Sequence, residues 1–211
     1  MNASIEKKLL AIAGEIIKEN DPSHDINHTK RVLSLAKKIA KAEKANLNII
    51  VPAAIFHDAI CYQKNHPKSK DSARESADFA LKILDQFDFS KEVISKVYAS
   101  IDGCSFSKGV KAEFVEAKII QDADRLEATG AISIMRTFAS AGAMNTTFYN
   151  PHDPFCTNRK PEDLKYALDL VFTRLLEVSK KFHTQTAKKM AKSRHRFLQI
   201  FLKQLKTEIE L

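Results

Sequence analysis

This 211-residue chain has little glycine and no tryptophan: it holds only five glycines. Scarce glycine argues against a sheet built from many tight hairpins and favours long helices. No apolar run approaches the roughly 20 residues that span a bilayer, which argues against a membrane protein. The N-terminal stretch mixes charges among its apolar positions, so we expect no signal peptide.

Cysteine is also scarce: the three present, Cys61, Cys104 and Cys156, are odd in number and far apart. This usage argues against a disulfide framework and for a reducing compartment, so we expect a cytoplasmic protein. The hydrophobic share of 44% and the charged share of 28% are ordinary for a globular chain. The length fits one domain, and we expect residues 1–211 to form it.

Acidic residues are absent between Val178 and Thr207, although the whole chain carries a net charge of +8. This stretch is either a solvated helix face, which we favour, or a field that attracts a polyanionic small molecule such as a nucleotide. Nucleic-acid binding fits less well, because the stretch lacks the regular interleaving of aromatic residues in a stacking platform. Its basic residues are Lys180, Lys181, Lys188, Lys189, Lys192, Arg194, Arg196, Lys203 and Lys206.

Apolar residues recur at helical spacing along most of the chain, and no alternation of period two is long enough for a strand. The pattern therefore predicts an all-α fold. Complete helices are expected at residues 4–19, 48–61, 131–141, 162–182 and 185–208, with further helices starting near 26, 71 and 90 and one ending near 130. Only residues 144–161 read as a sizeable irregular segment, which we expect to form a lid or a pocket wall.

The most informative feature is an apolar run, residues 53–56, that leads directly into His57 and Asp58. Burying these two side chains costs several kcal/mol unless something neutralises them, and a divalent metal ion would do so. On a helix their side chains diverge by about 100°, yet both can coordinate one ion that lies between them. His28 shares the inward face of its helix with Val32 and offers a third ligand, although an isolated buried histidine is more typical of a core.

Two aspartates, Asp122 and Asp124, offer a further carboxylate on one predicted helix. Helical periodicity does not separate them, and we expect one to point inward and the other outward. Two histidines with two carboxylates form a nitrogen–oxygen site in which Mn²⁺ is the expected ion and Fe²⁺, Co²⁺, Ni²⁺, Zn²⁺ or Mg²⁺ are alternatives. Four protein ligands on an octahedral ion leave two positions for water and substrate, which is a catalytic arrangement.

The order His28, His57-Asp58, Asp124 resembles the H…HD…D signature of the HD-domain metal-dependent phosphohydrolases. The segment HTKRV resembles the H-x-x-R-V element of that family, and QDADRLEA resembles its A-D-R-L element, which selects Asp124 over Asp122. The nearest resemblance is to small stand-alone bacterial HD proteins, and it covers roughly residues 21–205. It implies an all-helical bundle with a central metal, a metal-binding core at about 21–130 and C-terminal helices at about 131–211.

The resemblance also implies an activity: hydrolysis of a phosphate ester or of a nucleotide anhydride. Asp124 or Asp25 is expected to take the proton of the attacking water, and Arg31, Lys64 and Arg125 are expected to bind phosphate charge. The substrate is expected to be a small phosphorylated molecule, in particular a nucleotide. The alternative is a non-catalytic module, stapled by metal, that senses a nucleotide or binds a partner protein.

The sequence leaves the roles of several other residues open. Many family members follow the HD pair with Ile-Gly-Lys, whereas the lysine comes later here, at position 64. No second pair of histidines clearly supplies a binuclear site, and His66 reads as a loop residue. Asp25 also reads as a helix N-cap that could orient His28, and the pair His152-Asp153 reads as turn chemistry. Arg194, in the C-terminal stretch that resembles the family's T-x-x-x-x-x-A-x-x-R, is a weaker candidate for a phosphate contact.

Overall fold

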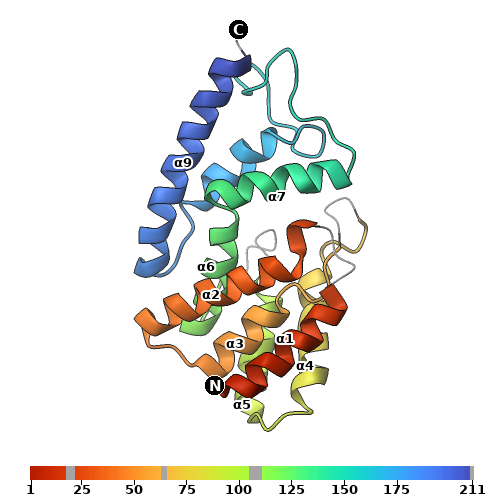
Figure 1. The fold of residues 1–211 in the computed structure, drawn as a ribbon, viewed down its shortest axis with the longest axis vertical. Helices are drawn as coiled ribbons and strands as arrows, with labels where there is room; N and C mark the ends of the chain where they lie inside the picture. The colour runs from red at the N-terminus through yellow and green to blue at the C-terminus, as the bar shows by residue number, and fades with distance from the viewer. Residues whose placement is uncertain (18–21, 63–65, 105–110, 210–211) are drawn as a thin grey trace. The chain divides into compact units, whose positions relative to one another are not determined.

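The computed structural model describes residues 1–17, 22–62, 66–104 and 111–209, which are mostly helical (Figure 1). Within these ranges the only extended pairing is an isolated bridge between Thr147 and Tyr166. The predicted all-α fold is therefore confirmed. The chain divides into two compact units, Met1–Asp124 and Arg125–Leu211, which are described separately below. None of the described helices is both long and apolar enough to cross a membrane.

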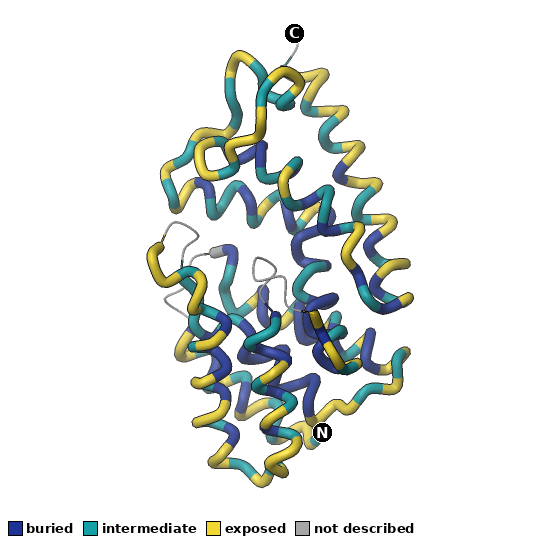
Figure 2. Tube along the Cα trace, turned by 180° about the vertical axis from the view of Figure 1, so that it is seen from behind, coloured by how far each residue is buried: buried dark blue, intermediate teal, exposed yellow. Residues whose placement is uncertain are grey.

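The N-terminal unit is organised around α3 (Leu47–Phe56), which contacts four other helices of the unit. Every residue from Ile49 to Phe56 is buried, as expected for a helix that is apolar on all sides. The four helices around it each have a buried and an exposed side (Figure 2). The helices around α3 are α1 (Ala3–Ile17), α2 (Ile26–Glu43), α4 (Ser72–Leu84) and α5 (Lys91–Asp102).

The predicted helix at 48–61 is wrong at its C-terminal end, because α3 stops at Phe56. The backbone turns there, and the amide of Ala59 donates to the carbonyl oxygen of Phe56 at 3.1 Å. The following residue is held by α4: the hydroxyl of Ser76 accepts from the amide of Ile60 and donates to the carbonyl of Ile60, both at 3.0 Å. These bonds satisfy backbone groups that a longer helix would have paired internally.

Helix α6 (Val115–Glu127) crosses the boundary between the two units. Its N-terminal part is fixed within the first unit by two side chains. Glu116 accepts from the amide of Asn46, the N-cap of α3, at 3.0 Å. Gln121 donates to the carbonyl oxygen of Gly103, the C-cap of α5, at 2.7 Å.

The C-terminal unit contains α7 (Gly130–Ala143), the π-helical turn η3 (Val171–Leu175), α8 (Leu176–Val178) and α9 (Gln185–Ile209), with α7 packed on α9. The predicted helix at 162–182 is too long. The amides of Ala167 and Leu168 donate instead to the carbonyl oxygens of Thr147 and Phe148, at 2.9 and 2.8 Å. This pairing withdraws backbone donors from a helical ladder, so regular helix begins only after it.

The irregular segment at 144–161 is held down by side chains of its own unit. Arg159 donates through both terminal nitrogens to the fully buried carboxylate of Asp169, with Nη2–Oδ1 at 2.7 Å. Asp153 accepts from the amides of Thr157 and Asn158 at 2.9 and 2.7 Å. The segment has a defined backbone, and its predicted role as a lid or pocket wall stays a prediction.

Candidate metal centre

Four side chains of the N-terminal unit converge: His28, His57, Asp58 and Asp124 each offer one ligand atom, and all four atoms lie within 4.8 Å of one another. The two histidines are buried, and the two aspartates are half-buried. They come from α2, from the end of α3 and from α6, so segments far apart in the sequence meet here. These are the four residues that the sequence nominated as metal ligands.

The spacing of the donor atoms is close to that of ligands around a single ion. The Nε2 atoms of His28 and His57 are 3.2 Å apart. Oδ2 of Asp58 lies 3.4 Å from the first and 3.5 Å from the second. Oδ1 of Asp124 lies 3.8 and 3.9 Å from the same two nitrogens. Bonds of about 2.0–2.2 Å to one ion place neighbouring donors roughly 3.0–3.5 Å apart, so small movements of Asp124 would complete such a set.

His28 reaches this point because Asp25 starts α2 just before it. Asp25 is the N-cap residue, and its Oδ1 accepts from the amide of His28 at 2.8 Å. Its Oδ2 accepts from the side-chain amide of Asn27 at 3.0 Å. The carboxylate of Asp25 therefore fixes the first turn of α2, and with it the direction of the His28 side chain.

His57 is oriented by the last turn of α3. Its Nδ1 lies 2.9 Å from the carbonyl oxygen of Ala54. A carbonyl oxygen only accepts, so in the neutral ring Nδ1 carries the proton and Nε2 keeps its lone pair. Such a bond to the far nitrogen is what metal-binding histidines generally have, and it aims Nε2 at the cluster.

The electrostatics of the cluster favour a carboxylate at Asp58. Burial by itself would raise the pKa of this carboxyl group, but the positive charge of His57 when that ring is protonated and a hydrogen bond from His28 hold the pKa well below its usual value. An ionised carboxylate beside two imidazole nitrogens is a good ligand set for a divalent transition ion. The donor set thus fits a divalent transition ion.

The two aspartates of α6 are separated by the structure, and neither points into solvent as the sequence pattern predicted for one of them. Asp122 is fully buried, whereas the side chain of Asp124 keeps 20% of its exposure and lies in the cluster. The prediction of one outward carboxylate is wrong, because α6 is buried on more than one side: Ala117, Ile120 and Ala123 are buried as well as Ile119 and Leu126.

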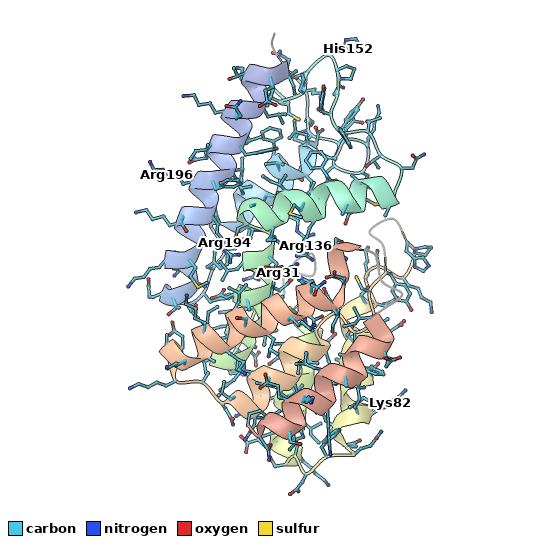
Figure 3. The ribbon with its side chains drawn as sticks, in the orientation of Figure 1. Arg31, Lys82, Arg136, His152, Arg194 and Arg196 are labelled. Atoms are coloured by element: carbon cyan, nitrogen blue, oxygen red, sulfur yellow. The ribbon has the colours of Figure 1, made fainter. Side chains whose placement is uncertain are left out.

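The predicted phosphate-binding residues are more dispersed. Arg31 lies on α2 less than one turn after His28 and is half-buried (Figure 3). Lys64 lies outside the described residues. Nη1 of Arg125 donates to the carbonyl oxygen of Lys181 at 2.8 Å and lies 2.8 Å from Nε2 of His183, so it fixes a turn of the C-terminal unit. The phosphate roles of all three stay predictions.

Arg194 and Arg196 lie on opposite sides of α9 (Figure 3). Nη1 of Arg194 donates to the carbonyl oxygen of Leu126, in the last turn of α6, at 2.6 Å. Burial lowers the pKa of this guanidinium, and the charge of Glu127 opposes that shift. Arg194 thus caps a helix end within its unit, while Arg196 is exposed like Lys188, Lys189 and Lys192.

Two supporting features were missed by the sequence analysis. The hydroxyl of Ser76 holds Ile60, the second residue after Asp58. In the sequence it could be suspected only as a polar position on the otherwise apolar stripe of Ala73, Ala77 and Ala80. His24 and Cys61 lie together beside Asp58. No spacing rule connects these two, because they come from different segments that only the fold brings together.

Comparison with known proteins assigns the family. The model of the HD domain matches residues 25–129. The chain is 34% identical over 198 residues to the uncharacterized protein YpgQ of Bacillus subtilis, covering 92% of this chain and 88% of that protein. The crystal structure of YpgQ in complex with ADP is similar with a TM-score of 0.76 and 30% identity, over 97% of both chains.

A second solved structure, an HD-superfamily hydrolase from Bacillus thuringiensis, has a TM-score of 0.71 and 29% identity, over 97% of this chain and 96% of that one. These matches extend over both compact units, so the resemblance is not confined to the metal-ligand motifs. The family resemblance drawn from the sequence is confirmed. The chain belongs to the HD-domain superfamily of metal-dependent hydrolases and is similar to YpgQ over most of its length.

Proposed function

We propose that this protein is a metal-dependent phosphohydrolase that cleaves a phosphate ester or anhydride bond of a nucleotide. The observation that carries the proposal is the convergence of His28, His57, Asp58 and Asp124 on one point of the N-terminal unit. Two imidazole nitrogens with two carboxylates are typical ligands of Mn²⁺ and related divalent ions. A bound divalent ion would lower the pKa of a water molecule and polarise a phosphoryl oxygen.

The nucleotide class is supported from two sides. YpgQ, which is 30% identical over 97% of this chain, is known in complex with ADP. The net charge of +8 favours the approach of an anionic substrate. We therefore prefer a nucleotide over an uncharged or cationic substrate.

The chain's own side chains divide the work in this proposal. Asp124 is the carboxylate of the cluster that lies farther from the two imidazole nitrogens, at 3.8 and 3.9 Å, and it serves as both ligand and acceptor for the proton of the attacking water. Asp25 acts as a positioning residue, because both of its oxygens already accept hydrogen bonds at the start of α2. Arg31 follows His28 by three residues on α2, and with Lys64 and Arg125 it is proposed to balance phosphate charge.

We include a cytoplasmic location in the proposal. All three cysteines lie in the described residues, and none of them forms a disulfide. Thiols that are kept reduced are typical of the cytoplasm.

The test is a panel of nucleoside mono-, di- and triphosphates incubated with the purified chain and Mn²⁺, Co²⁺ or Mg²⁺ in turn. Release of phosphate or pyrophosphate and the nucleotide product are measured together with the metal content per chain. The His57→Ala and Asp58→Ala variants should each lose the ion and at least about a hundredfold in turnover, because removing a ligand disrupts both binding and catalysis.

His152→Ala is the matched control. This variant removes the histidine of the pair His152-Asp153. His152 lies in an exposed turn of the C-terminal unit (Figure 3). This variant should keep its metal and its turnover. Full metal occupancy in the Asp58→Ala protein would contradict the ligand assignment, and a wild-type protein that binds the ion but cleaves no phosphorylated compound would contradict the activity.

A further inference from the structure

Two aromatic rings are stacked shortly after the metal-ligand pair in the N-terminal unit. The rings of Tyr62 and His66 are parallel to within 9°, and their centroids are 4.8 Å apart. Tyr62 is half-buried and His66 is exposed. Because one face of the His66 ring lies against Tyr62, the exposure of His66 comes from its opposite face and its edges. Together the two residues present a flat aromatic surface to solvent.

Contacts with neighbouring groups hold both rings in place. The hydroxyl of Tyr62 donates to the carboxylate of Glu75, on α4, at 2.7 Å. Nδ1 of His66 accepts from the amide of Lys68 at 3.1 Å, and the ammonium group of Lys68 lies 5.9 Å from the centroid of the Tyr62 ring. Both rings are thus already oriented, so a ligand that stacks on them loses little affinity to the ordering of side chains.

Helix α4 also fixes the rings relative to the metal centre. The hydroxyl of Ser76 binds both backbone groups of Ile60, the second residue after Asp58. One turn earlier on α4, the hydroxyl of Ser72 accepts from the amide of Tyr62 at 3.2 Å. The segment therefore follows α4 in a fixed register, and the contact of Tyr62 with α4 lies about 6 Å, or one helical turn, beyond that of Ile60.

The distance between the metal ligands and the rings suits a nucleotide. Tyr62 follows Asp58 by four residues, and even a fully extended chain of that length spans no more than about 14 Å. The turn at residues 57–58 shortens this distance. A nucleotide with its phosphates on the metal centre reaches over a comparable length to its base. Every base has a π-face, and tyrosine and histidine are among the side chains on which bases stack.

We propose that Tyr62 and His66 form the subsite for the base of the bound nucleotide, which stacks on the outer face of the His66 ring. The inference deepens the proposed function and rests on it for the nucleotide. Stacking depends on the flat shape of a base and not on its hydrogen-bonding edge, so this subsite accepts purines and pyrimidines. It favours nucleotides over pyrophosphate and over phosphorylated sugars, which have no base.

The test compares two ligands that share a diphosphate group and differ in the presence of a base. They are α,β-methylene-ADP and methylenediphosphonate, which both resist cleavage between their phosphorus atoms. Calorimetric titration of the full chain, loaded with Mn²⁺, measures the two affinities. His66→Ala should weaken binding of α,β-methylene-ADP about 5- to 150-fold, the range expected for loss of an aromatic stacking partner, and should leave binding of methylenediphosphonate unchanged.

Further variants separate stacking from other effects. His66→Phe keeps a flat ring and should retain most of the affinity for α,β-methylene-ADP. Tyr62→Leu should weaken binding of α,β-methylene-ADP alone. Tyr98→Leu is its matched control and should bind both ligands like wild type, because Tyr98, on α5, also donates to a carboxylate of α4, that of Asp78, at 3.1 Å. Circular dichroism and metal content establish that the helices and the metal centre of each variant are intact.

The outcomes distinguish this inference from the proposed function. Unchanged affinity of His66→Ala for α,β-methylene-ADP would overturn the subsite and leave the proposed function standing. An equal loss for both ligands would overturn it as well, because the loss would then come from the phosphates or the metal. A wild-type chain that binds α,β-methylene-ADP through His66 and hydrolyses no nucleotide would overturn the proposed activity and leave the subsite standing.

Discussion

Replacing Arg159 by methionine should strongly destabilise the C-terminal unit, because it leaves a buried charge without its partner. Asp169 is fully buried, and both of its oxygens accept from Arg159. Removing one member of a buried ion pair costs about 3–5 kcal/mol. Since the side chain of Arg159 keeps 17% of its exposure, we expect the lower end, about 3 kcal/mol.

For a chain of this size a loss of about 3 kcal/mol lowers the midpoint of thermal unfolding by roughly 6–12 °C. Differential scanning calorimetry of the two proteins measures it. Arg196→Met is the matched control, since Arg196 is an exposed arginine of the same unit, and its effect should stay within about 0.5 kcal/mol. The double variant Arg159→Met/Asp169→Asn should recover part of the loss, because the uncompensated charge is gone.

The loss of stability in Arg159→Met should also depend on pH. Burial raises the pKa of Asp169, but the hydrogen bonds from Arg159 and from the amide of Glu162 outweigh it and hold the pKa below its usual value. In wild type this group stabilises the fold above the unfolded pKa of about 3.9, and that contribution is lost as the pH falls through the lower folded pKa. In the variant burial dominates and the carboxyl can take up a proton, so the two proteins should approach each other in stability as the pH is lowered. A difference below about 1 kcal/mol at pH 7, or one that grows on acidification, would refute the reasoning.

Three further predictions concern other parts of the chain. Gly130 has φ of 76°, and a Cβ atom there would lie 3.1 Å from Cβ of Arg194. Gly130→Ala should therefore lower the free energy of unfolding, measured in urea, by about 2–4 kcal/mol. A loss below about 1 kcal/mol would argue against the close approach of α7 to α9. Asp124→Asn should abolish turnover, whereas Asp122→Asn should leave measurable turnover; the reverse order of effects would move the ligand role to the other aspartate. If the basic face of α9 steers substrate, neutralising three of its exposed lysines should lower kcat/KM at low salt but hardly change kcat, and the difference from wild type should fade as the salt concentration rises. Equal kcat/KM of wild type and variant at low salt would leave the interpretation of a solvated helix face standing. The three are Lys188, Lys189 and Lys192.

The sequence determined the fold class and the identity of the four metal-ligand candidates. Helical spacing of apolar residues is a local property, and scarce glycine argued against the competing hairpin-rich folds. His57 and Asp58 stood out because ionisable groups at the end of an apolar run are costly to bury without a partner. The motifs around His28 and Asp124 then connected three separate segments through their resemblance to the HD family.

Where each helix ends depends on the tertiary structure, because distant groups take over backbone hydrogen bonds that a longer helix would have made. It ends α3 at Phe56, because the turn and Ser76 take over the backbone beyond it. It shortens the predicted helix at 162–182, because Thr147 and Phe148 accept from amides that a helix would have used. Such partners lie far away in sequence, so no local pattern reveals them.

The same limit applies to the candidate sites. Whether Asp122 or Asp124 enters the cluster depends on what packs around α6, which periodicity along one helix does not encode. His24 and Cys61 are near Asp58 only because the start of α2 and the end of α3 meet. Sequence spacing specifies side-chain directions within one helix, while the distances between ligand atoms on different helices follow from how those helices pack.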